Sequence, residues 1–410
     1  MVSNEPEIFE LGEIVRTIAP PRKIKNSEYL ADGTYPIVDQ SAAAVAGWTE
    51  DKSALVHPKQ DGLIVFGDHT CVLKFLTEPF AQGADGIKII EVRSGFNTHY
   101  VFAHLAAFPL RQDGYKRHFS ELKRLRVRIP NIRIQGAISG ILRTLDSKIA
   151  ANSAVVETLE QIAQTIFKSW FIDFRPVHAK ARGQRPEGMD AETAALFPDS
   201  FEESESGLIP AGWSYTEISK FAKVVTGKTP STSRLELWGR SKMFVTIPDL
   251  HHTTVVTTTK RALSSEGSRS LRKHQIPARS TLVSCIATAG LVGWASDELH
   301  TNQQINSATP LRDSHSEWLL FKLKSMAPEI AELASSGSIY PNLNKSTFSE
   351  MRILLAHDAL LDAFSNSVSP FVGLMTALSK QNELLEKLRD AMLPRLISGE
   401  LEIPEELLVD

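Results

Sequence analysis

The stretch Leu142–Trp170, LRTLDSKIAANSAVVETLEQIAQTIFKSW, decides the architecture of this chain. Apolar residues recur in it at alternating intervals of three and four, the pattern of a helix that packs along one seam against another helix. A polar residue, Asn152, stands near the middle of the seam. The stretch therefore predicts a long amphipathic helix that pairs with another helix.

A second stretch, Phe371–Met392 (FVGLMTALSKQNELLEKLRDAM), repeats this rhythm, with Gln381 at the place of Asn152. Upstream of the two helices, HFSELK (His118–Lys123) and TFSEMR (Thr347–Arg352) fall at the same displacement. We expect a duplicated module in which each helix follows a globular head, and the two helices run antiparallel. Asn152 and Gln381 would then meet near a pseudo-twofold axis and fix the register; the alternative is that both amides face solvent.

The composition is that of a folded chain with material for two domains. It has 410 residues, 42% of them hydrophobic. No apolar stretch approaches the roughly 18 residues of a membrane span, and the first residues have no signal-like apolar core. We therefore expect a cytoplasmic protein without a membrane partner. Cys71 and Cys285 lie far from any metal-ligand spacing, so neither a disulfide framework nor a metal site is expected.

Charge is divided unevenly along the chain, although the net charge is only −3. Residues 208–359 hold 17 Lys and Arg against 12 Asp and Glu, whereas residues 360–410 hold 4 against 9. A second basic cluster lies between Arg111 and Arg133. Such clusters suit a polyphosphate partner, and the alternative is that they are solvated surface.

The fold class that we expect is α/β, with two similar mixed α/β heads and a pair of long antiparallel coiled-coil helices. Short β-prone runs between Gly and Pro turns favour strands in both heads. The polar segment between the modules, punctuated by Pro and Gly, is typical of a linker. The expected divisions are a first head over 1–131, a first helix over 132–174, a linker over 175–212, a second head over 213–359, a second helix over 360–400 with a kink at Pro370, and a tail over 401–410.

Helix length suggests a use for the coiled coil. About 25 to 30 helical residues span roughly 37 to 45 Å, and one turn of B-DNA spans about 34 to 36 Å. A rod of that length could hold two DNA-binding heads about one turn apart on the duplex.

At this point the chain resembles a known family, the specificity subunits of type I restriction–modification enzymes, and the resemblance covers nearly the whole sequence. The motifs that carry it are WFIDFRPVHAKARGQRPEGMDAETAALFPDSF (Trp170–Phe201), GLIPAGW (Gly207–Trp213), LPRLISGEL (Leu393–Leu401), LVSCIATAGLVGWA (Leu282–Ala295) and NQQIN (Asn302–Asn306). The first head keeps Tyr35-Pro36, Gly62 and Gly67 but has no NQQIN counterpart.

The resemblance implies a DNA-binding protein that performs no chemistry itself. Each head would be a target-recognition domain for one half of a split double-stranded DNA sequence, and the coiled coil would set the gap. Two methyltransferase subunits and restriction motor-nuclease subunits would be the partners. S-adenosylmethionine, ATP and magnesium would belong to those partners, and the chain itself would hold no cofactor.

Motifs for catalysis are missing or incomplete. Methylation of an exocyclic amine needs an Asn or Asp followed by Pro-Pro and an aromatic residue, but the only Pro-Pro is Pro20-Pro21. Thr226-Gly227-Lys228-Thr229 imitates the end of a phosphate-binding loop, yet Ala222 stands where its first glycine belongs and Pro230 follows. These residues fit a basic entry loop into the second head better.

Two other classes of function remain open from the sequence. Asp39 followed by Glu50-Asp51-Lys52 imitates the constellation of a magnesium-dependent DNA endonuclease, although carboxylates near a lysine are common on surfaces. DNA cleavage by the chain with magnesium alone, abolished by Asp39→Ala, would favour that class. A coiled-coil scaffold without DNA binding would explain the helices but not the basic heads.

Candidate DNA contacts are basic, amide and hydroxyl side chains in or beside loops, because such groups bind phosphates and base edges. In the first head they are Arg22, Lys23, Lys25, Gln40, Ser41 and Lys74. In the second head they are Lys228, Thr229, Ser231, Thr232, Arg234, His251, His252, Arg269, Arg272 and Lys273. Asn302, Gln303 and Asn306 are expected to brace the head's own loops rather than to contact bases.

Overall fold

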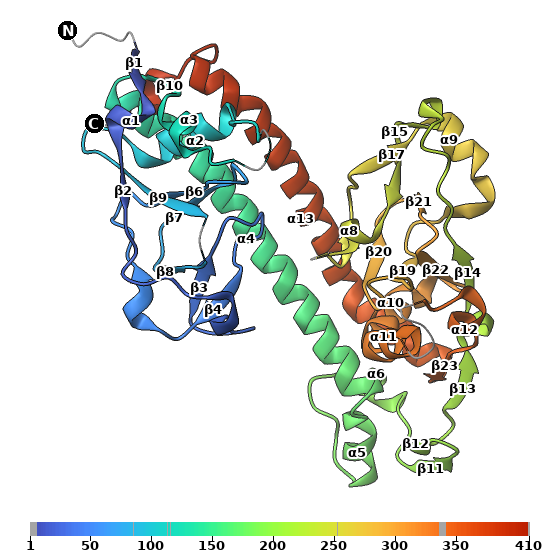
Figure 1. Cartoon of the computed structure of the whole chain (residues 1–410). Coiled ribbons are helices and arrows are strands. Elements are labelled where there is room, and N and C mark those ends of the chain that lie inside the picture. The colour runs from blue at the N-terminus through green and yellow to red at the C-terminus, as the bar shows by residue number, and fades with distance from the viewer. Residues whose placement is uncertain are drawn as a thin grey trace. The chain divides into compact units, whose positions relative to one another are not determined.

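The computed structural model describes residues 6–84, 86–112, 114, 116–251, 253–335 and 342–408. The chain divides into two compact units, Met1–Ile149 with Leu385–Asp410, and Ala150–Leu384. Each unit holds one mixed α/β head and part of two long helices, α4 (Ile132–Phe171) and α13 (Asp358–Ser398). Figure 1 shows α4 in green and α13 in red. Within the described residues, no helix is both long and apolar enough to cross a membrane.

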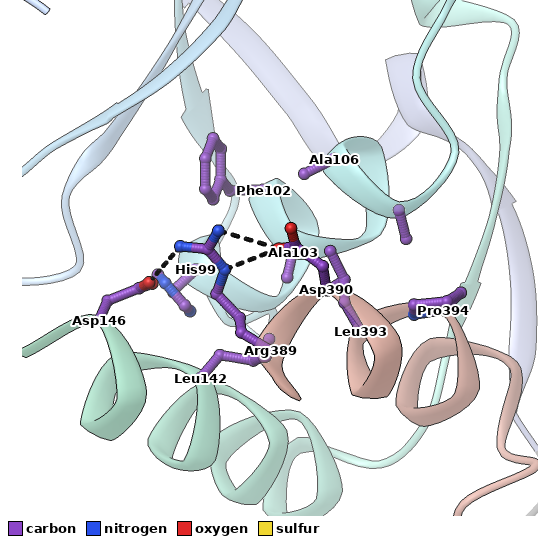
Figure 2. Close-up of a pocket in the computed structure, with 11 residues that line it drawn as sticks. His99, Phe102, Ala103, Ala106, Leu142, Asp146, Arg389, Asp390, Leu393 and Pro394 are labelled. Carbon is purple, nitrogen blue, oxygen red and sulfur yellow. Dashed lines mark hydrogen bonds and ion pairs between the residues drawn. The ribbon is translucent and has the colours of Figure 1, made fainter. Parts of the chain in front are cut away.

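The helices α4 and α13 pack antiparallel, as the two seams predicted. In the second unit, Asn152 contacts Gln381, and further along α4 the ring of Trp170 lies 5.9 Å from that of Phe364. In the first unit, Asp146 contacts Arg389 (Figure 2). In the second unit, the partner residue in α13 comes earlier in the chain as the residue in α4 comes later, so the two helices run in opposite directions. Helix α13 continues through Pro370 without a break in its helical assignment.

Helix α4 ends where its sequence stops supporting it. Phe174 adopts a left-handed conformation with φ of 49°, and Pro176 then occupies the first turn of α5 (Arg175–Ala181). A left-handed residue ends a helix, and proline is compatible with the first turn of the next one. The chain therefore turns sharply after Phe171.

The first head contains two four-stranded sheets, with strand orders β2-β9-β6-β7 and β4-β3-β8-β5. A separate antiparallel ladder joins β1 to β10. The strands are β1 (Glu7–Glu10), β2 (Val15–Ile18), β3 (Tyr35–Val38), β4 (Gly47–Thr49), β5 (Leu55–Val56), β6 (Leu63–Gly67), β7 (Leu73–Leu76), β8 (Phe80–Gln82), β9 (Ile87–Val92) and β10 (Arg126–Ile129). The helical elements are α1 (Leu11–Ile14), η1 (Asn26–Glu28), η2 (Lys52–Ala54), α2 (Thr98–Ala107) and α3 (Phe119–Lys123).

Strand β6 shows why the first head folds as it does. All five of its residues are buried. Ile64 and Phe66 enter the core beneath α2 and α4, whereas Leu63 and Val65 enter a second core on the opposite face. A strand buried on both faces requires a continuous apolar run rather than alternation, which is the character of LIVF in the sequence.

The second head contains a five-stranded sheet, β14-β22-β19-β20-β16, and a four-stranded sheet, β17-β15-β21-β18. The strands are β13 (Ser214–Glu217), β14 (Ala222–Thr226), β15 (Trp238–Val245), β16 (Val255–Val256), β17 (Arg261–Leu263), β18 (Gln275–Ile276), β19 (Thr281–Ser284), β20 (Val292–Ala295), β21 (Leu299–Thr301), β22 (Ile305–Pro310) and β23 (Arg352–Leu355). The helical elements are α7 (Ile218–Phe221), η3 (Leu235–Leu237), α8 (Ile247–Leu250), α9 (Ser265–Ser270), η4 (Arg272–His274), η5 (Asp313–His315), α10 (Ser316–Ser325), α11 (Ala327–Ser335) and α12 (Lys345–Glu350).

The two heads share one topology although their sequences differ. The antiparallel run β2-β9-β6-β7 corresponds to β14-β22-β19-β20, and the ladder β1-β10 corresponds to β13-β23. In the smaller sheets, β3 pairs parallel with β8, as β15 pairs parallel with β21. Helices α2 and α10 pack on equivalent strands. The expectation of two similar mixed α/β heads is confirmed.

The segment 175–212, interpreted from sequence as a linker, is folded. It forms α5, α6 (Ala191–Ala195) and a hairpin of β11 (Phe201–Ser204) and β12 (Gly207–Pro210). Val177, Phe197 and Ile209 are buried in the core of the second unit. The sequence interpretation weighed charge and Pro and Gly content, but these few apolar residues suffice to fix the segment to the core. The tail beyond α13 forms η6 (Glu405–Leu407).

Candidate nucleic-acid interface

The loop that follows β14 is held tightly on the turn between β21 and β22. The backbone N–H of Gly227 donates to the carbonyl of Ile305 at 3.1 Å, and that of Lys228 donates to the carbonyl of Thr301 at 3.0 Å. A Cβ atom at Gly227 would lie 2.2 Å from the side chain of Thr301 and from the carbonyl oxygen of Asn302. Only glycine allows this approach, so the loop is fixed where it leaves the sheet.

The NQQIN segment forms the brace beneath that loop, as predicted. Asn302 is 7% exposed, and its amide nitrogen donates to Oε1 of Gln304 at 2.9 Å. Asn306 is 2% exposed, and its Oδ1 accepts a 2.6 Å hydrogen bond from Thr226 Oγ1. Gln303 between them is exposed, and its Oε1 accepts a hydrogen bond from Thr229. Buried, paired amides fix loop geometry.

The motif Thr226–Thr229 is not part of a phosphate-binding loop. Such a loop opens directly into a helix whose N-terminus faces the phosphate. Here β14 ends at Thr226, and the next helical element is the three-residue η3, which begins at Leu235. The alternative role, a basic loop at the entrance to the second head, stays a prediction.

Lys228 lies in this loop, Arg269 lies in α9, and Arg272 and Lys273 lie in η4; we call these four residues the basic strip. His274 Nδ1 donates a 2.9 Å hydrogen bond to the carbonyl of Thr226, which ties η4 to the end of β14. All four strip residues are exposed. Within the part of the chain that the structure describes, their side chains make no hydrogen bond or ion pair, so their charges are available to an anion. Thr232 is also exposed.

The remaining candidates of the second head are engaged locally. Arg234 forms ion pairs with Glu236 at 2.7 Å and Glu266 at 3.9 Å. The hydroxyl of Ser231 lies 2.8 Å from that of Ser233, and its carbonyl accepts a hydrogen bond from Trp238. His251 is exposed after α8, whereas His252 lies outside the described residues.

In the first head, Arg22 is paired with acidic residues, whereas Lys23 and Lys25 are exposed. Arg22 forms ion pairs with Glu28 and Asp51, and hydrogen bonding to Asp51 raises the pKa of its guanidinium. Lys25 is exposed and precedes η1. The backbone of Lys23 forms an isolated parallel β-bridge with that of Gln82.

Lys74 is a structural residue. Its side chain is 9% exposed, and its ammonium donates to the carbonyl oxygens of Asp39 at 2.9 Å and Ala43 at 2.6 Å. Burial lowers the pKa of the ammonium. Lys74 holds the 39–43 loop in place, so its direct contact with DNA does not fit this geometry. Ser41, in the same loop, donates to the Asp39 carboxylate at 2.6 Å.

The turn between β8 and β9 is the first head's counterpart of the NQQIN turn, and sequence comparison missed it because it contains no amide run. A Cβ atom at Gly83 would lie 2.1 Å from the hydroxyl of Tyr29, and one at Gly86 would lie 2.7 Å from the amide of Gln40. Gly86 also has φ of 112°. The signal in the sequence that could have revealed this turn is its two closely spaced glycines. The close approach of neighbouring atoms requires glycine at both positions, and the positive φ requires it at Gly86.

The endonuclease constellation is taken up by local structure. Asp39 accepts from Ser41, Glu50 accepts from the backbone N–H and hydroxyl of Thr34, and Asp51 caps η2 through Ser53. No group of three or more His, Cys, Asp or Glu side chains that could hold a metal ion occurs among the described residues. Each carboxylate thus stabilises a turn.

A family model decides the assignment. The model described as the type I restriction modification DNA specificity domain matches this chain twice, over residues 4–161 and 210–358. The chain belongs to this family. It is a specificity subunit, the non-catalytic component of a type I restriction–modification system, with two DNA-recognition domains.

Relatives agree with the assignment. The specificity subunit of the type I restriction enzyme HindI from Haemophilus influenzae is 37% identical over 323 residues, which are 69% of this specificity subunit and 70% of that protein. The MjaIX specificity subunit of Methanocaldococcus jannaschii is 30% identical over 192 residues, 46% of this chain and 44% of that one. The crystal structure of an S subunit from M. genitalium matches the fold with a TM-score of 0.57 at 12% identity, covering 97% of both chains.

Proposed function

We propose that this specificity subunit recognises a split sequence in double-stranded DNA, with one half read by each head. The observation that carries the proposal is that two heads of one topology present different exposed side chains on their loops. A common frame explains why both bind the same kind of molecule, and divergent loops explain why each would prefer its own bases. Base edges provide the distinction in the DNA grooves.

The pair of α4 and α13 would set the gap between the two half-sites. Helices of 40 and 41 residues are rigid elements with a rise of about 1.5 Å per residue. Their antiparallel seam is fixed by the amide of Asn152, and this prevents the helices from sliding against each other. A gap set by helix length would be independent of the bases that each head reads.

In the second head, the basic strip would bind phosphates, since its four cations are exposed and Lys228 lies in a loop that the NQQIN brace holds. Thr229, Ser231, Thr232, Arg234 and His251 would lie closer to base edges or support the loop. In the first head, Arg22, Lys23, Lys25, Gln40 and Ser41 stay our candidates, and Lys74 supports the 39–43 loop.

The partners would be two methyltransferase subunits and the restriction motor-nuclease subunits. S-adenosylmethionine, ATP and magnesium would be bound by those partners, which perform methylation and cleavage. Because its substrate is the cell's own and incoming DNA, the assembly would work in the cytoplasm.

Methylome sequencing of cells that express the chain with its methyltransferase subunit tests the proposal. We expect one methylated motif made of two short sequences separated by a fixed run of unspecified bases. Exchange of residues 213–357 for the second head of another specificity subunit should change one half of the motif and leave the other half and the gap intact. Methylation of a continuous motif, or a change in both halves, would refute the proposal.

A further inference from the structure

An exposed leucine stands in the loop between β14 and β15 of the second head. Leu235 is 78% exposed, the highest value among the large apolar side chains that the structure describes. It opens η3, whose last residue, Leu237, is only 4% exposed. Contact of an apolar side chain with water is unfavourable, and burial against a partner molecule would relieve it.

The loop that presents Leu235 is fastened to the rest of the head. The carbonyl of Leu237 accepts a hydrogen bond from the backbone N–H of Ser264 at 3.0 Å, and the hydroxyl of Ser264 donates to the carbonyl of Glu236 at 2.6 Å. A Cβ atom at Gly267 in α9 would lie 2.0 Å from the carbonyl oxygen of Leu237. The backbone of η3 therefore rests directly on α9, the helix that also carries one residue of the basic strip.

The two side chains next to Leu235 in the chain suit base edges better than phosphates. Arg234 and Glu236 form an ion pair at 2.7 Å. Hydrogen bonding to Arg234 lowers the pKa of the Glu236 carboxyl, which keeps it ionised. Phosphates repel a carboxylate, whereas the amino group of cytosine in the major groove can donate to one. This part of the loop therefore fits the floor of a groove rather than the DNA backbone.

The first head presents a leucine at the same place in its topology. Strands β2 and β3 correspond to β14 and β15, and the loop between them holds η1 and then Leu30, which is 46% exposed. Three candidate contacts of the first head, Arg22, Lys23 and Lys25, share that loop. Two loops of unlike sequence thus combine charged side chains with an exposed leucine.

We propose that Leu235 contacts the C5-methyl group of a thymine and thereby selects a T·A pair at one position of the second head's half-site. That methyl group is the apolar feature that base edges offer in the major groove, and an aliphatic side chain gains from contact with it. The inference rests on the proposed function, in which this head reads one half of a split sequence. Leu235 would carry base preference, whereas contacts from the basic strip to phosphates carry none.

Removal of the methyl group from the DNA and of the side chain from the protein tests the contact. The probe is a duplex with the methylated motif, in which each thymine of the second head's half-site is replaced in turn by deoxyuridine. Fluorescence anisotropy measures its affinity for the full-length chain in complex with the methyltransferase subunit. The variants are Leu235→Ala and Leu235→Met. Leu311→Ala is the matched control, because Leu311 is 68% exposed in the same head but follows β22 at the end away from the NQQIN turn.

We expect one deoxyuridine to weaken binding of the wild-type chain by about fourfold, which is what burial of one methyl group contributes. Leu235→Ala should lose at least as much affinity for thymine DNA, and the same deoxyuridine should then weaken it by less than about twofold more, because the two changes remove one contact. Leu235→Met should keep the preference for thymine, and Leu311→Ala should behave like the wild-type chain.

A wild-type chain that no deoxyuridine affects would overturn the inference, as would a Leu235→Ala chain that still prefers thymine to the wild-type extent. A half-site made only of G·C pairs would overturn it too. These three results leave recognition of a split sequence standing, whereas a wild-type complex that binds no split sequence would refute the proposed function as well. Insertion of Leu235 between two base pairs would make a fluorescent adenine analogue at that step brighten with the wild-type chain and not with Leu235→Ala. That result would also overturn the inference.

Discussion

Asn152 donates a 2.8 Å hydrogen bond from its amide nitrogen to Oε1 of Gln381, the residue that holds the same place in the second repeat. The neighbouring pair behaves alike, since Asn382 donates to its own repeat equivalent, Ser153, at 3.1 Å. A residue can touch its symmetry equivalent only close to the symmetry axis. The helix seam therefore crosses a local pseudo-twofold axis at these amides.

Replacement of Asn152 with leucine should raise stability while weakening the register. Asn152 itself is 3% exposed. Gln381 and Asn382, which accept its hydrogen bonds, reach solvent, so water can replace the amide of Asn152 as their donor. A polar residue at a seam position specifies register at a cost in stability, so we expect a gain of about 1 kcal/mol in the free energy of unfolding. Urea denaturation measures it. Gln161→Leu, at an exposed amide on the same helix, should change the value by less than about 0.5 kcal/mol. A loss of stability in Asn152→Leu would contradict this account.

Replacement of Phe197 with alanine should destabilise the second unit, although Phe197 lies in a segment that resembles a linker. Its side chain is 2% exposed and contacts Trp170 edge-to-face at 5.3 Å. Removal of a buried phenylalanine costs about 3 to 5 kcal/mol. Leu208→Ala, in the same segment but 65% exposed, is the control and should change little. Equal denaturation midpoints for the two variants would show that the segment is not anchored.

Loss of single cations from the basic strip should weaken DNA binding and reduce its salt dependence. Lys228→Ala and Arg272→Ala each remove one exposed charge. If each neutralises one phosphate, the slope of log K against log salt should become shallower by about 0.9. Fluorescence anisotropy of the methyltransferase complex on its target DNA measures the slope. Lys220→Ala, at the other end of β14 and paired with Glu217 at 3.8 Å, should leave it unchanged. A variant with wild-type affinity at all salt concentrations is not at a phosphate.

His99 should make the first unit less stable in acid. Burial lowers its pKa from 6.5 to about 4, so the unfolded chain binds the proton more readily than the folded one. The free energy of unfolding is therefore unaffected by this histidine above pH 6.5. As the pH falls toward 4, protonation of His99 in the unfolded chain lowers the free energy of unfolding by about 3 kcal/mol. We expect His99→Leu to remove this part of the pH dependence, measured by urea denaturation between pH 4 and 8. His57→Leu, at an exposed histidine, is the control and should keep the pH dependence of the wild-type chain. Parallel pH profiles for wild type and His99→Leu would refute the assignment.

The sequence predicted best what depends on local periodicity. The seam and its amide follow from spacing along a few residues. It failed where one contact between distant segments decides the outcome. Phe197 anchors an otherwise polar segment, and Lys74 holds the 39–43 loop although it resembles any surface lysine in the sequence.

The turn at Gly83 and Gly86 could not be predicted because it requires the correspondence between the two heads. That correspondence lies in strand order rather than in residues.

The central claim is that the paired helices set the distance between the half-sites. Seven-residue insertions placed in α4 after Asn152 and in α13 after Gln381 preserve the seam and lengthen each helix by about 10 Å. The account predicts a methylated motif with both halves unchanged and a gap longer by about three base pairs, at about 3.4 Å each. A seven-residue insertion after Glu205, in the turn between β11 and β12, should leave the gap unchanged. An unaltered gap in the lengthened helices, with the motif still methylated, would contradict the claim.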